Sequence, residues 1–286
     1  MHLGYSVSSA GDVNGDGYSD VIVGADWYSN GQQYEGGAFV YHGSSIGLAT
    51  GSPDWTAESN QEDAYFGSSV SEAGDVNGDG YSDVIIGAYA YDNGQSEEGR
   101  AYVYYGSSTG LTSGAPDWTV ESDHIDSEFG DSVANAGDVN GDGYSDVIVG
   151  SKEYYNDLML EGRAYVYLGS ASGLEASEDW MIEGDQQGAW LGSSVSSAGD
   201  VNGDGYCDVI VGSEGYDNPE ASEGASFIYY GNGEVDSSLS LIPQQRLADD
   251  SAPLGFLGLT GSEDGVTIQA NARTPYGRGK VKLEVE

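Results

Sequence analysis

The chain has 286 residues, of which 48 are acidic and 8 are basic, so its formal net charge is -40. This length permits one large all-β domain or two small ones with a substantial buried core. The charge argues against nucleic acids and anionic membrane surfaces as partners and makes cations the natural counterpart.

No apolar stretch of the sequence approaches the roughly 18 residues of a membrane span, and the first residues do not show the charged and apolar segments of an export signal. Because these residues already belong to a repeat, we interpret the N-terminus as a cut through a longer protein, with a genuine short start as the alternative. Cys207 is the single cysteine, so no intrachain disulfide is possible.

One motif recurs four times along the chain, Asp-Val-Asn-Gly-Asp-Gly-Tyr-(Ser/Cys)-Asp, at intervals of 63, 63 and 62 residues. An apolar residue followed by glycine precedes each motif by nine residues, and an aromatic residue follows its first aspartate by 27. These landmarks divide residues 1–243 into four units, at about 3–58, 66–121, 129–183 and 191–243. The apolar residues are Leu3, Phe66, Phe129 and Leu191, and the aromatic residues are Phe39, Tyr102, Tyr165 and Phe227.

Each unit has the pattern of four β-strands, which the second unit illustrates. Residues 67–73 are small, as expected of an inner strand crowded near a central axis. Residues 84–86 form a short apolar run that suits a strand covered on both faces. Residues 100–105 and 117–121 are rich in aromatic and β-branched side chains. A lone unit cannot bury its apolar faces, so successive units must stack.

With these residues the chain resembles the FG-GAP repeat of integrin α-subunit propellers and their bacterial relatives, over about residues 3–243. Phe66-Gly67 and Phe129-Gly130 match the first half of that name, and Gly24-Ala25 and Gly87-Ala88 match the second, whereas its proline is absent from all four copies. The resemblance implies an all-β propeller or partial propeller of four-stranded blades. Family propellers usually have seven blades and this chain supplies four repeats, so closure stays open.

The repeated loop presents oxygen atoms at the spacing that a calcium ion needs. Calcium takes six to eight oxygen ligands, from carboxylates, carbonyls and water. Positions 1, 3, 5 and 9 supply side chains and position 7 a carbonyl, while glycines at positions 4 and 6 let the backbone curl. We therefore predict about four Ca²⁺ sites. Their ligands are Asp12, Asn14, Asp16, Tyr18 and Asp20; Asp75, Asn77, Asp79, Tyr81 and Asp83; Asp138, Asn140, Asp142, Tyr144 and Asp146; and Asp200, Asn202, Asp204, Tyr206 and Asp208.

An EF-hand is excluded, because its bidentate glutamate at position 12 is replaced by valine or isoleucine of the second strand. The loop is therefore a β-hairpin connection. A metal-free turn is the alternative, since Asp, Asn and Gly favour turns. Three carboxylates in each of four small loops favour calcium, which we predict to be structural. Cys207 replaces serine at position 8, which we interpret as a noncoordinating spacer.

Strands that run up and down place the loops between the second and third strands on the face opposite the calcium hairpins. These loops are residues 25–35, 88–98, 151–161 and 213–223. In the resembling integrin propellers that face is used for ligands, so we predict a protein or carbohydrate ligand here, with loop-to-loop packing as the alternative. The loops carry Trp27, Tyr28, Tyr34, Tyr89, Tyr91, Tyr154, Tyr155 and Tyr216.

The segment 244–286 lacks the loop motif. Residues 266–272 and 280–286 alternate as strands around the turn 274–277. The segment is a degenerate last blade or a truncated β-sandwich, and the pattern slightly favours the second.

Catalysis finds no support, because His2, His42 and His124 occupy unrelated repeat positions and no nucleophile motif is present. The leading hypothesis is a non-enzymatic calcium-binding adhesion or recognition module, extracellular or at the cell surface. The alternative is the accessory propeller of a secreted hydrolase whose catalytic domain lies outside this chain. A purely structural spacer is the third hypothesis.

Overall fold

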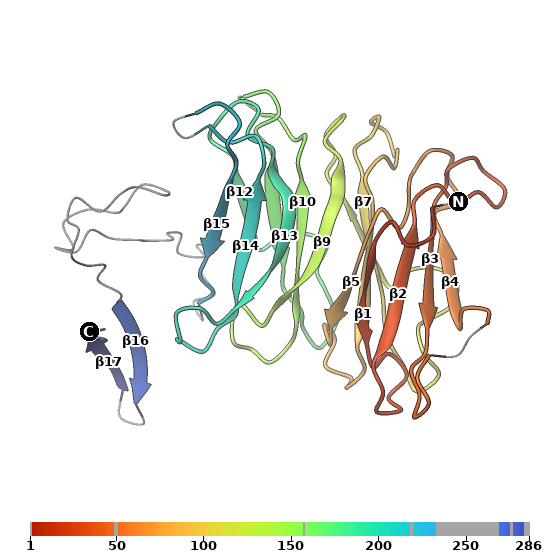
Figure 1. The fold of residues 1–286 in the computed structure, drawn as a ribbon, viewed down its shortest axis with the longest axis horizontal. Coiled ribbons are helices and arrows are strands. Elements are labelled where there is room, and N and C mark those ends of the chain that lie inside the picture. The colour runs from red at the N-terminus through yellow and green to blue at the C-terminus, as the bar shows by residue number, and fades with distance from the viewer. Residues whose placement is uncertain are drawn as a thin grey trace.

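The computed structural model describes residues 2–48, 51–156, 158–217 and 220–232, together with the backbone of 269–274 and 277–282. These residues form strands and connecting loops and contain no helix, so none forms a helix able to span a membrane. The all-β prediction is confirmed. Figure 1 shows the sheets following one another along an arc, as a partial propeller without a closed ring.

Each repeat forms one antiparallel sheet whose strands pair in chain order. The first sheet contains β1 (Val7–Gly11), β2 (Asp20–Ala25), β3 (Gly37–Tyr41) and β4 (Trp55–Glu58). The second contains β5 (Ser69–Gly74), β6 (Asp83–Ala88), β7 (Arg100–Tyr104) and β8 (Trp118–Glu121). The third contains β9 (Phe129–Gly137), β10 (Asp146–Ser151), β11 (Arg163–Tyr167) and β12 (Trp180–Glu183). The fourth contains β13 (Leu191–Gly199), β14 (Asp208–Ser213) and β15 (Ala225–Tyr229).

The four-strand pattern is therefore confirmed in the first three repeats, with strand ends within three residues of the predicted ones. A fourth strand of the last repeat would fall after Asn232, outside the described residues. In the C-terminal segment β16 (Gln269–Thr274) pairs antiparallel with β17 (Gly277–Lys282). The predicted hairpin is present, but its second strand begins three residues earlier than expected, because the ladder reaches the turn by pairing Thr274 with Gly277.

The first strands β1, β5, β9 and β13 lie beside one another, which confirms them as the inner strands. Their small residues permit a very close approach between repeats. A Cβ atom on Gly24 would lie 2.0 Å from the backbone oxygen of Gly67, the glycine of the next apolar-glycine pair. The preceding residue, Phe66, is fully buried, and its backbone bridges Gly36 of the previous repeat. The apolar-glycine pair therefore joins one repeat to the next.

Apolar side chains fill the space between successive sheets in three clusters, one for each joint. All six residues of β6 and of β10 are buried, as predicted for the second strand. The fourth-strand tryptophans link repeats directly. Trp55 Nε1 donates a hydrogen bond to the backbone oxygen of Thr112 at 2.8 Å, and the Trp55 ring packs edge-on against Tyr104 with 4.8 Å between ring centroids. Stability thus resides in the joints rather than in single sheets.

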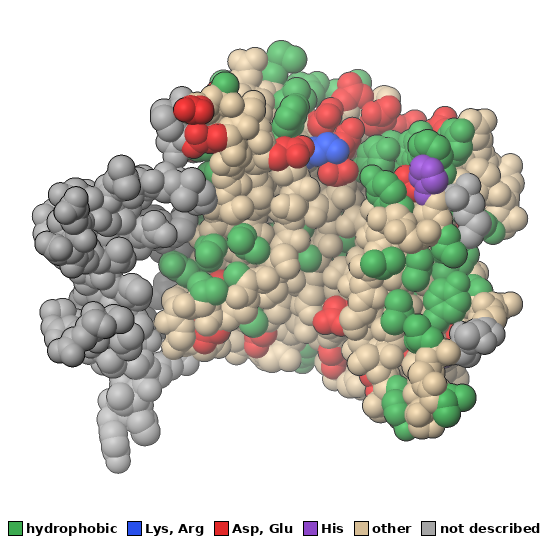
Figure 2. Space-filling model, viewed as in Figure 1, with side chains coloured by type: hydrophobic (Ala, Val, Ile, Leu, Met, Phe, Trp, Pro, Cys, Tyr) green, Lys and Arg blue, Asp and Glu red, His purple; other side chains and the backbone are tan. Residues whose placement is uncertain are grey.

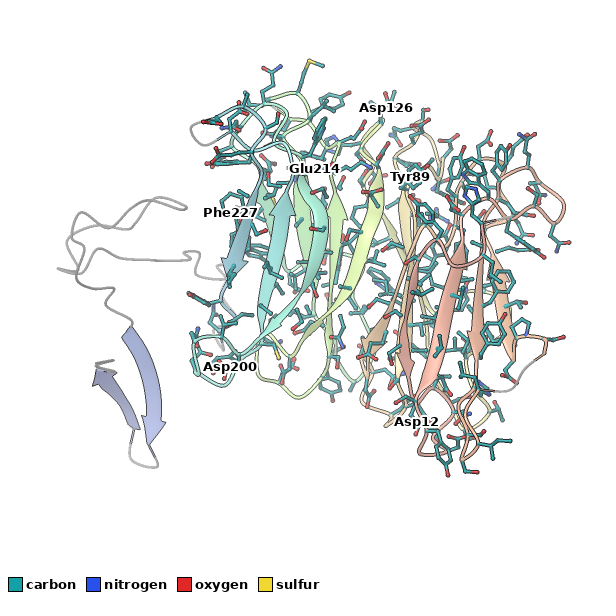
Figure 3. The ribbon with its side chains drawn as sticks, in the orientation of Figure 1. Asp12, Tyr89, Asp126, Asp200, Glu214 and Phe227 are labelled. Atoms are coloured by element: carbon teal, nitrogen blue, oxygen red, sulfur yellow. The ribbon has the colours of Figure 1, made fainter. Side chains whose placement is uncertain are left out.

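The two ends of the sheets form two faces of the molecule. Figure 3 shows the hairpin residues Asp12 and Asp200 at the lower face, and Tyr89, Asp126 and Glu214 at the upper face. We call these the hairpin face and the opposite face. The predicted separation of the two sets of loops is confirmed.

Candidate metal centres

The nine-residue loop between the first and second strands folds around its first aspartate. In the second repeat the Asp75 carboxylate accepts the amides of Gly78 at 2.7 Å, Asp79 at 3.1 Å and Gly80 at 2.9 Å. Gly78 and Gly80 have φ of 74° and 91°, the left-handed region that glycine adopts without strain. Asn77 Oδ1 accepts the amide of Asp79 at 2.9 Å. The side chains at positions 1, 3 and 5 are therefore gathered by the loop's own backbone.

The aspartate at position 9 is buried in all four repeats and has a second role. Asp83 accepts the amide of Val76 through Oδ2 and that of Gly106 through Oδ1, both at 2.9 Å. Burial raises the pKa of Asp83 to about 7, and the neighbouring carboxylates of Asp79 and Asp75 add to the rise, although the two backbone hydrogen bonds oppose it. This residue ties the hairpin to the connection between the third and fourth strands. The same pairs of bonds recur at Asp20, Asp146 and Asp208.

The predicted ligands thus share a loop, but among the described residues none of the loops brings three carboxylate oxygens within 4.8 Å of one another. The loop amides hold these oxygens instead: Asp75 Oδ1 accepts two amides, whereas its Oδ2 accepts the amide of Gly80 and keeps a further lone pair. The donor set consists of carboxylates, a side-chain amide and backbone carbonyls, which is the chemistry that calcium prefers. A buried carboxylate beside two others is stabilised by a cation, so the residues fit calcium.

Successive hairpins also contact one another at positions 7 and 8. The Tyr81 ring lies against Gly15 of the preceding loop, where a Cβ atom would meet it at 2.5 Å. Ser82 donates its amide to the oxygen of Asp12 at 3.1 Å and accepts the Asp12 amide through Oγ at 3.2 Å. Cys207 keeps the backbone bond to Asp138 at 2.9 Å and places sulfur where serine places a hydroxyl. Position 8 is therefore a joint residue as well as a spacer, which its serine in three of four copies could have suggested.

On the opposite face, four of the eight predicted aromatic residues pack on the sheets below them. Tyr28 meets Phe39 edge-on at 5.4 Å, and Arg163 lies over the ring of Tyr154 at 3.7 Å. Tyr91 and Tyr216 pack edge-on against Tyr102 and Phe227. For these four tyrosines the alternative of loop packing holds.

Three other predicted aromatic residues form a continuous row across the first two repeats. His2 stacks on Trp27 at 3.8 Å between ring centroids, and Trp27 lies 5.6 Å from Tyr34. Tyr65 then stacks between Tyr34 at 6.1 Å and Tyr89 at 5.2 Å. Figure 2 shows apolar side chains and a histidine gathered at the upper right of the molecule, with acidic side chains beside them. We call the five residues His2, Trp27, Tyr34, Tyr65 and Tyr89 the aromatic row. The sequence analysis missed His2 and Tyr65, because the row crosses between repeats.

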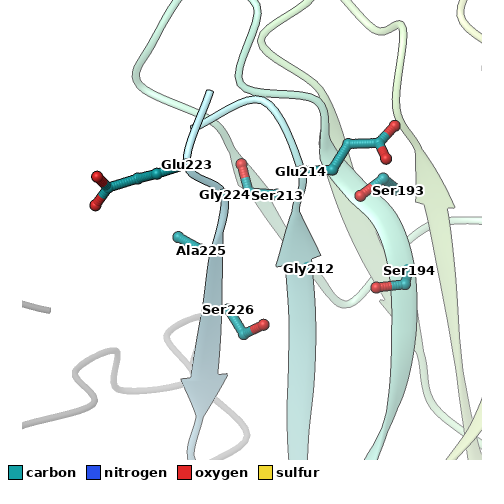
Figure 4. A pocket seen from close by; sticks show the side chains of 9 residues that line it. All are labelled: Ser193, Ser194, Gly212, Ser213, Glu214, Glu223, Gly224, Ala225 and Ser226. Atoms are coloured by element: carbon teal, nitrogen blue, oxygen red, sulfur yellow. The ribbon is translucent and has the colours of Figure 1, made fainter. Parts of the chain in front are cut away.

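The fourth repeat has a hollow at an edge that no other described strand covers, lined in part by Ser193, Gly212, Glu223 and Gly224 (Figure 4). At the three joints the equivalent places are filled by the next repeat. The amides of Phe66, Phe129 and Leu191 donate there to the oxygens of Glu35, Glu98 and Glu161. Among the described residues, the hollow therefore has the position that the next repeat fills at the other three joints.

Comparison with known families identifies the repeats. The FG-GAP repeat profile matches residues 3–41 and 66–104, and the FG-GAP-like repeat profile matches residues 138–211.

Similar proteins include integrin alpha subunits and a phospholipase D. Integrin alpha-4 from Xenopus laevis is 33% identical over 217 residues, covering 74% of this chain and 20% of that protein. Integrin alpha-V from Gallus gallus is 32% identical over 225 residues, covering 76% and 20%. Phosphatidylinositol-glycan-specific phospholipase D from Bos taurus is 32% identical over 208 residues, covering 68% and 24%. The chain spans a fifth to a quarter of the length of these relatives.

Proposed function

The chain belongs to the FG-GAP repeat family, and on that basis we propose that it is a calcium-binding, non-catalytic recognition or adhesion module of the cell exterior. Calcium stiffens the hairpin face, and the opposite face carries a protein or carbohydrate ligand. The observation that carries the proposal is the division of the molecule into these two faces. The predicted oxygen ligands recur on one face, and a row of exposed and half-buried aromatic rings lies on the other.

Calcium acts structurally in this proposal. Positions 1, 3 and 5 hold the ion from the exposed part of the loop, the carbonyl of position 7 adds a ligand, and the buried position 9 aspartate anchors the ion to the sheet. In the second repeat these are Asp75, Asn77, Asp79, Tyr81 and Asp83. Each bound Ca²⁺ offsets repulsion within its loop and fixes a hairpin that already contacts the next repeat through position 8.

The ligand surface is the aromatic row with its charged border. Trp27 is 44% exposed, and Lys152 lies 5.9 Å from the ring of Tyr89 while pairing with Glu128 at 2.8 Å. Flat apolar rings beside carboxylates and an ammonium group suit a partner that presents both apolar and polar surface, as proteins and carbohydrates do. Tyr155, which is 41% exposed on the third repeat, extends this surface.

The second candidate function is the accessory propeller of a secreted hydrolase. The likeness to phosphatidylinositol-glycan-specific phospholipase D favours it, because the similarity covers only 24% of that enzyme. Sequencing the complete gene separates the two candidates: an adjoining catalytic domain supports the hydrolase, and further repeats with an anchoring segment support adhesion.

The domain division also remains a proposal: four repeats over residues 1–243 and a C-terminal β segment over 244–286. Most of that segment lies outside the described residues. Leu254-Gly255 follows Leu191-Gly192 by 63 residues, which is the spacing of the repeat. This register favours the degenerate last blade over the separate sandwich.

Calorimetric titration of the calcium-free chain with Ca²⁺ tests the hairpin sites. We expect the double variant Asp75→Asn, Asp79→Asn to lose one hairpin site, whereas the exposed Glu62→Gln, which removes charge away from the hairpins, leaves all of them. Equal calcium uptake by both variants and the wild type would contradict the proposal. The ligand is then sought by binding the calcium-loaded chain to arrays of glycans and matrix proteins, where capture should disappear in Trp27→Ala.

A further inference from the structure

We propose that the opposite face of the second repeat holds an additional Ca²⁺ site, separate from the hairpin loops and formed by Glu98, Glu121 and Asp123. Glu98 lies near the end of the connection between β6 and β7, Glu121 is the last residue of β8, and Asp123 follows two residues later. The structure thus brings together three carboxylates from two connections at the end of one sheet.

The spacing of these carboxylates matches one ion. One oxygen from each residue lies within 4.8 Å of the oxygens of the other two. Oxygens bound at about 2.4 Å to a common calcium ion are at most twice that distance apart. Among the described residues this is the only group of three acidic, cysteine or histidine side chains that meets this limit.

Glu98 supplies the independent indication of a ligand. The residue has no exposed surface, and its Oε1 accepts the amide of Asn93. Its Oε2 is buried and has no hydrogen-bond partner among the described residues. A buried charged oxygen without a hydrogen-bond partner destabilises a fold, because nothing replaces the water that it loses. A cation between the three carboxylates removes that cost.

The backbone holds Glu98 firmly in this place. Its carbonyl oxygen accepts the hydroxyls of Ser122 and Ser127, both at 2.9 Å, and the amide of Phe129 at 3.2 Å. The Phe129 contact is part of the joint to the third repeat. An ion at this site therefore connects β8 to a segment that also supports the neighbouring repeat.

The charge at the site calls for a divalent ion. Arg100 donates to Glu121 Oε2 through Nε at 2.9 Å and through its terminal nitrogen, and Asn93 Nδ2 donates to Glu121 Oε1 at 2.6 Å. These donors orient Glu121, and the guanidinium neutralises one of the three carboxylates. A formal charge of -2 is left for one divalent cation. Carboxylate oxygens with an exposed side for water suit Ca²⁺.

Neighbouring repeats provide natural comparisons. In the first repeat the equivalent residues are Glu35, Glu58 and Asn60, and Glu35 Oε2 is also buried without a partner. Asn60 removes one charge there. In the third repeat Glu161, Glu183 and Asp185 keep all three carboxylates, but their oxygens do not meet the 4.8 Å limit. The complete and closely spaced set belongs to the second repeat.

Calcium titration of the full chain tests the proposal with three variants. Asp123→Asn gives the second repeat the residue of the first, and because Asp123 is exposed the variant should fold. Glu98→Gln removes the buried charge, and the hairpin variant Asp75→Asn, Asp79→Asn serves as the matched control. We expect the wild type to bind one Ca²⁺ more than its hairpins account for. Asp123→Asn should weaken that site by about tenfold or more, in line with the dependence of calcium affinity on ligand charge.

The outcomes separate this site from the hairpin sites. Loss of one site in Asp123→Asn and Glu98→Gln, and of a different one in the hairpin variant, supports the proposal. Calcium uptake by Asp123→Asn and Glu98→Gln equal to that of the wild type overturns it while leaving the hairpin sites intact. If Glu98→Gln fails to fold, as far-ultraviolet circular dichroism would reveal, Asp123→Asn alone decides.

Discussion

The hairpin face and the opposite face differ in how closely the repeats copy one another. The nine-residue hairpin loop varies only at position 8, and each loop contacts the next through the same backbone hydrogen bond. On the opposite face, the position fourteen residues after the first loop aspartate holds Asp26, Tyr89, Lys152 and Glu214 in the four repeats. Residues that hold repeats together must recur at every joint, whereas residues that meet a single ligand need not.

The opposite face contains both kinds of residue within one short loop. Two residues after the variable position every repeat has tyrosine, and all four tyrosines pack on the sheet below. Recurrence therefore separates the packing aromatics from those that we propose for recognition. Trp27 has no tryptophan counterpart in the other repeats, and it stands in the aromatic row.

The largest expected effect comes from removing calcium, because most of the proposed Ca²⁺ sites lie on the hairpin face. A ligand at 100 times its dissociation constant stabilises the folded state by about 2.7 kcal/mol for each site. Chelation with EDTA should therefore lower the melting temperature strongly, as measured by differential scanning calorimetry. The control is the protein prepared with Mg²⁺ in place of Ca²⁺ and treated with EDTA in the same way. An unchanged melting temperature of the calcium-loaded protein after EDTA would show that the hairpins need no metal.

The second effect tests the joints. Gly87→Ala places a Cβ atom 1.9 Å from the backbone oxygen of Gly130 in the next repeat, so we expect a loss of about 3 kcal/mol or more in the free energy of unfolding. Gly212→Ala is the matched control, because the fourth repeat has no described neighbour there and the new atom meets only the hydroxyl of Ser194. Urea unfolding measures both. Equal losses would mean that the joint at Gly87 is looser than the structure shows.

The third effect is an expected gain at the joint between the last two repeats. At position 8 of the second and third repeats, the hydroxyls of Ser82 and Ser145 accept the amide of the first aspartate of the preceding loop. Cys207→Ser places a hydroxyl at the same position of the fourth repeat. One hydrogen bond contributes about 0.5–1.5 kcal/mol, so the free energy of unfolding should rise by about 1 kcal/mol. The reverse change, Ser145→Cys, should lower it by a similar amount. Opposite signs in the two variants are the required result, and a change of the same sign in both would contradict this account of position 8.

The regular part of the structure was predictable because it repeats. The 63-residue spacing aligns four copies, so a landmark such as Phe66-Gly67 is recognised by its counterparts, and alternation or small-residue content then places the strands. Contacts between copies were not predictable. The bond from Ser82 to Asp12 and the stacking of Tyr65 on Tyr89 depend on the rotation between neighbouring sheets, which spacing does not contain.

The candidate sites divide in the same way. The proposed hairpin ligands are adjacent in sequence, so composition and spacing predict them. Glu98 precedes β7, whereas Glu121 and Asp123 lie at and after the end of β8, and a chain with 48 acidic residues offers many such sets. Only the structure brings these three together and shows that Glu98 is buried.

The smallest effect on stability is expected on the opposite face, where it separates the two kinds of aromatic residue. Trp27→Ala removes a side chain that is 44% exposed, so the free energy of unfolding should change by no more than about 0.5 kcal/mol while capture of the ligand is lost. Tyr28→Ala, one residue away, removes the edge-on contact with Phe39 and should lower stability by about 1–3 kcal/mol. Urea unfolding and ligand capture on the same samples provide both measurements. If Trp27→Ala proved as destabilising as Tyr28→Ala and left capture unchanged, the aromatic row would be packing rather than a recognition surface.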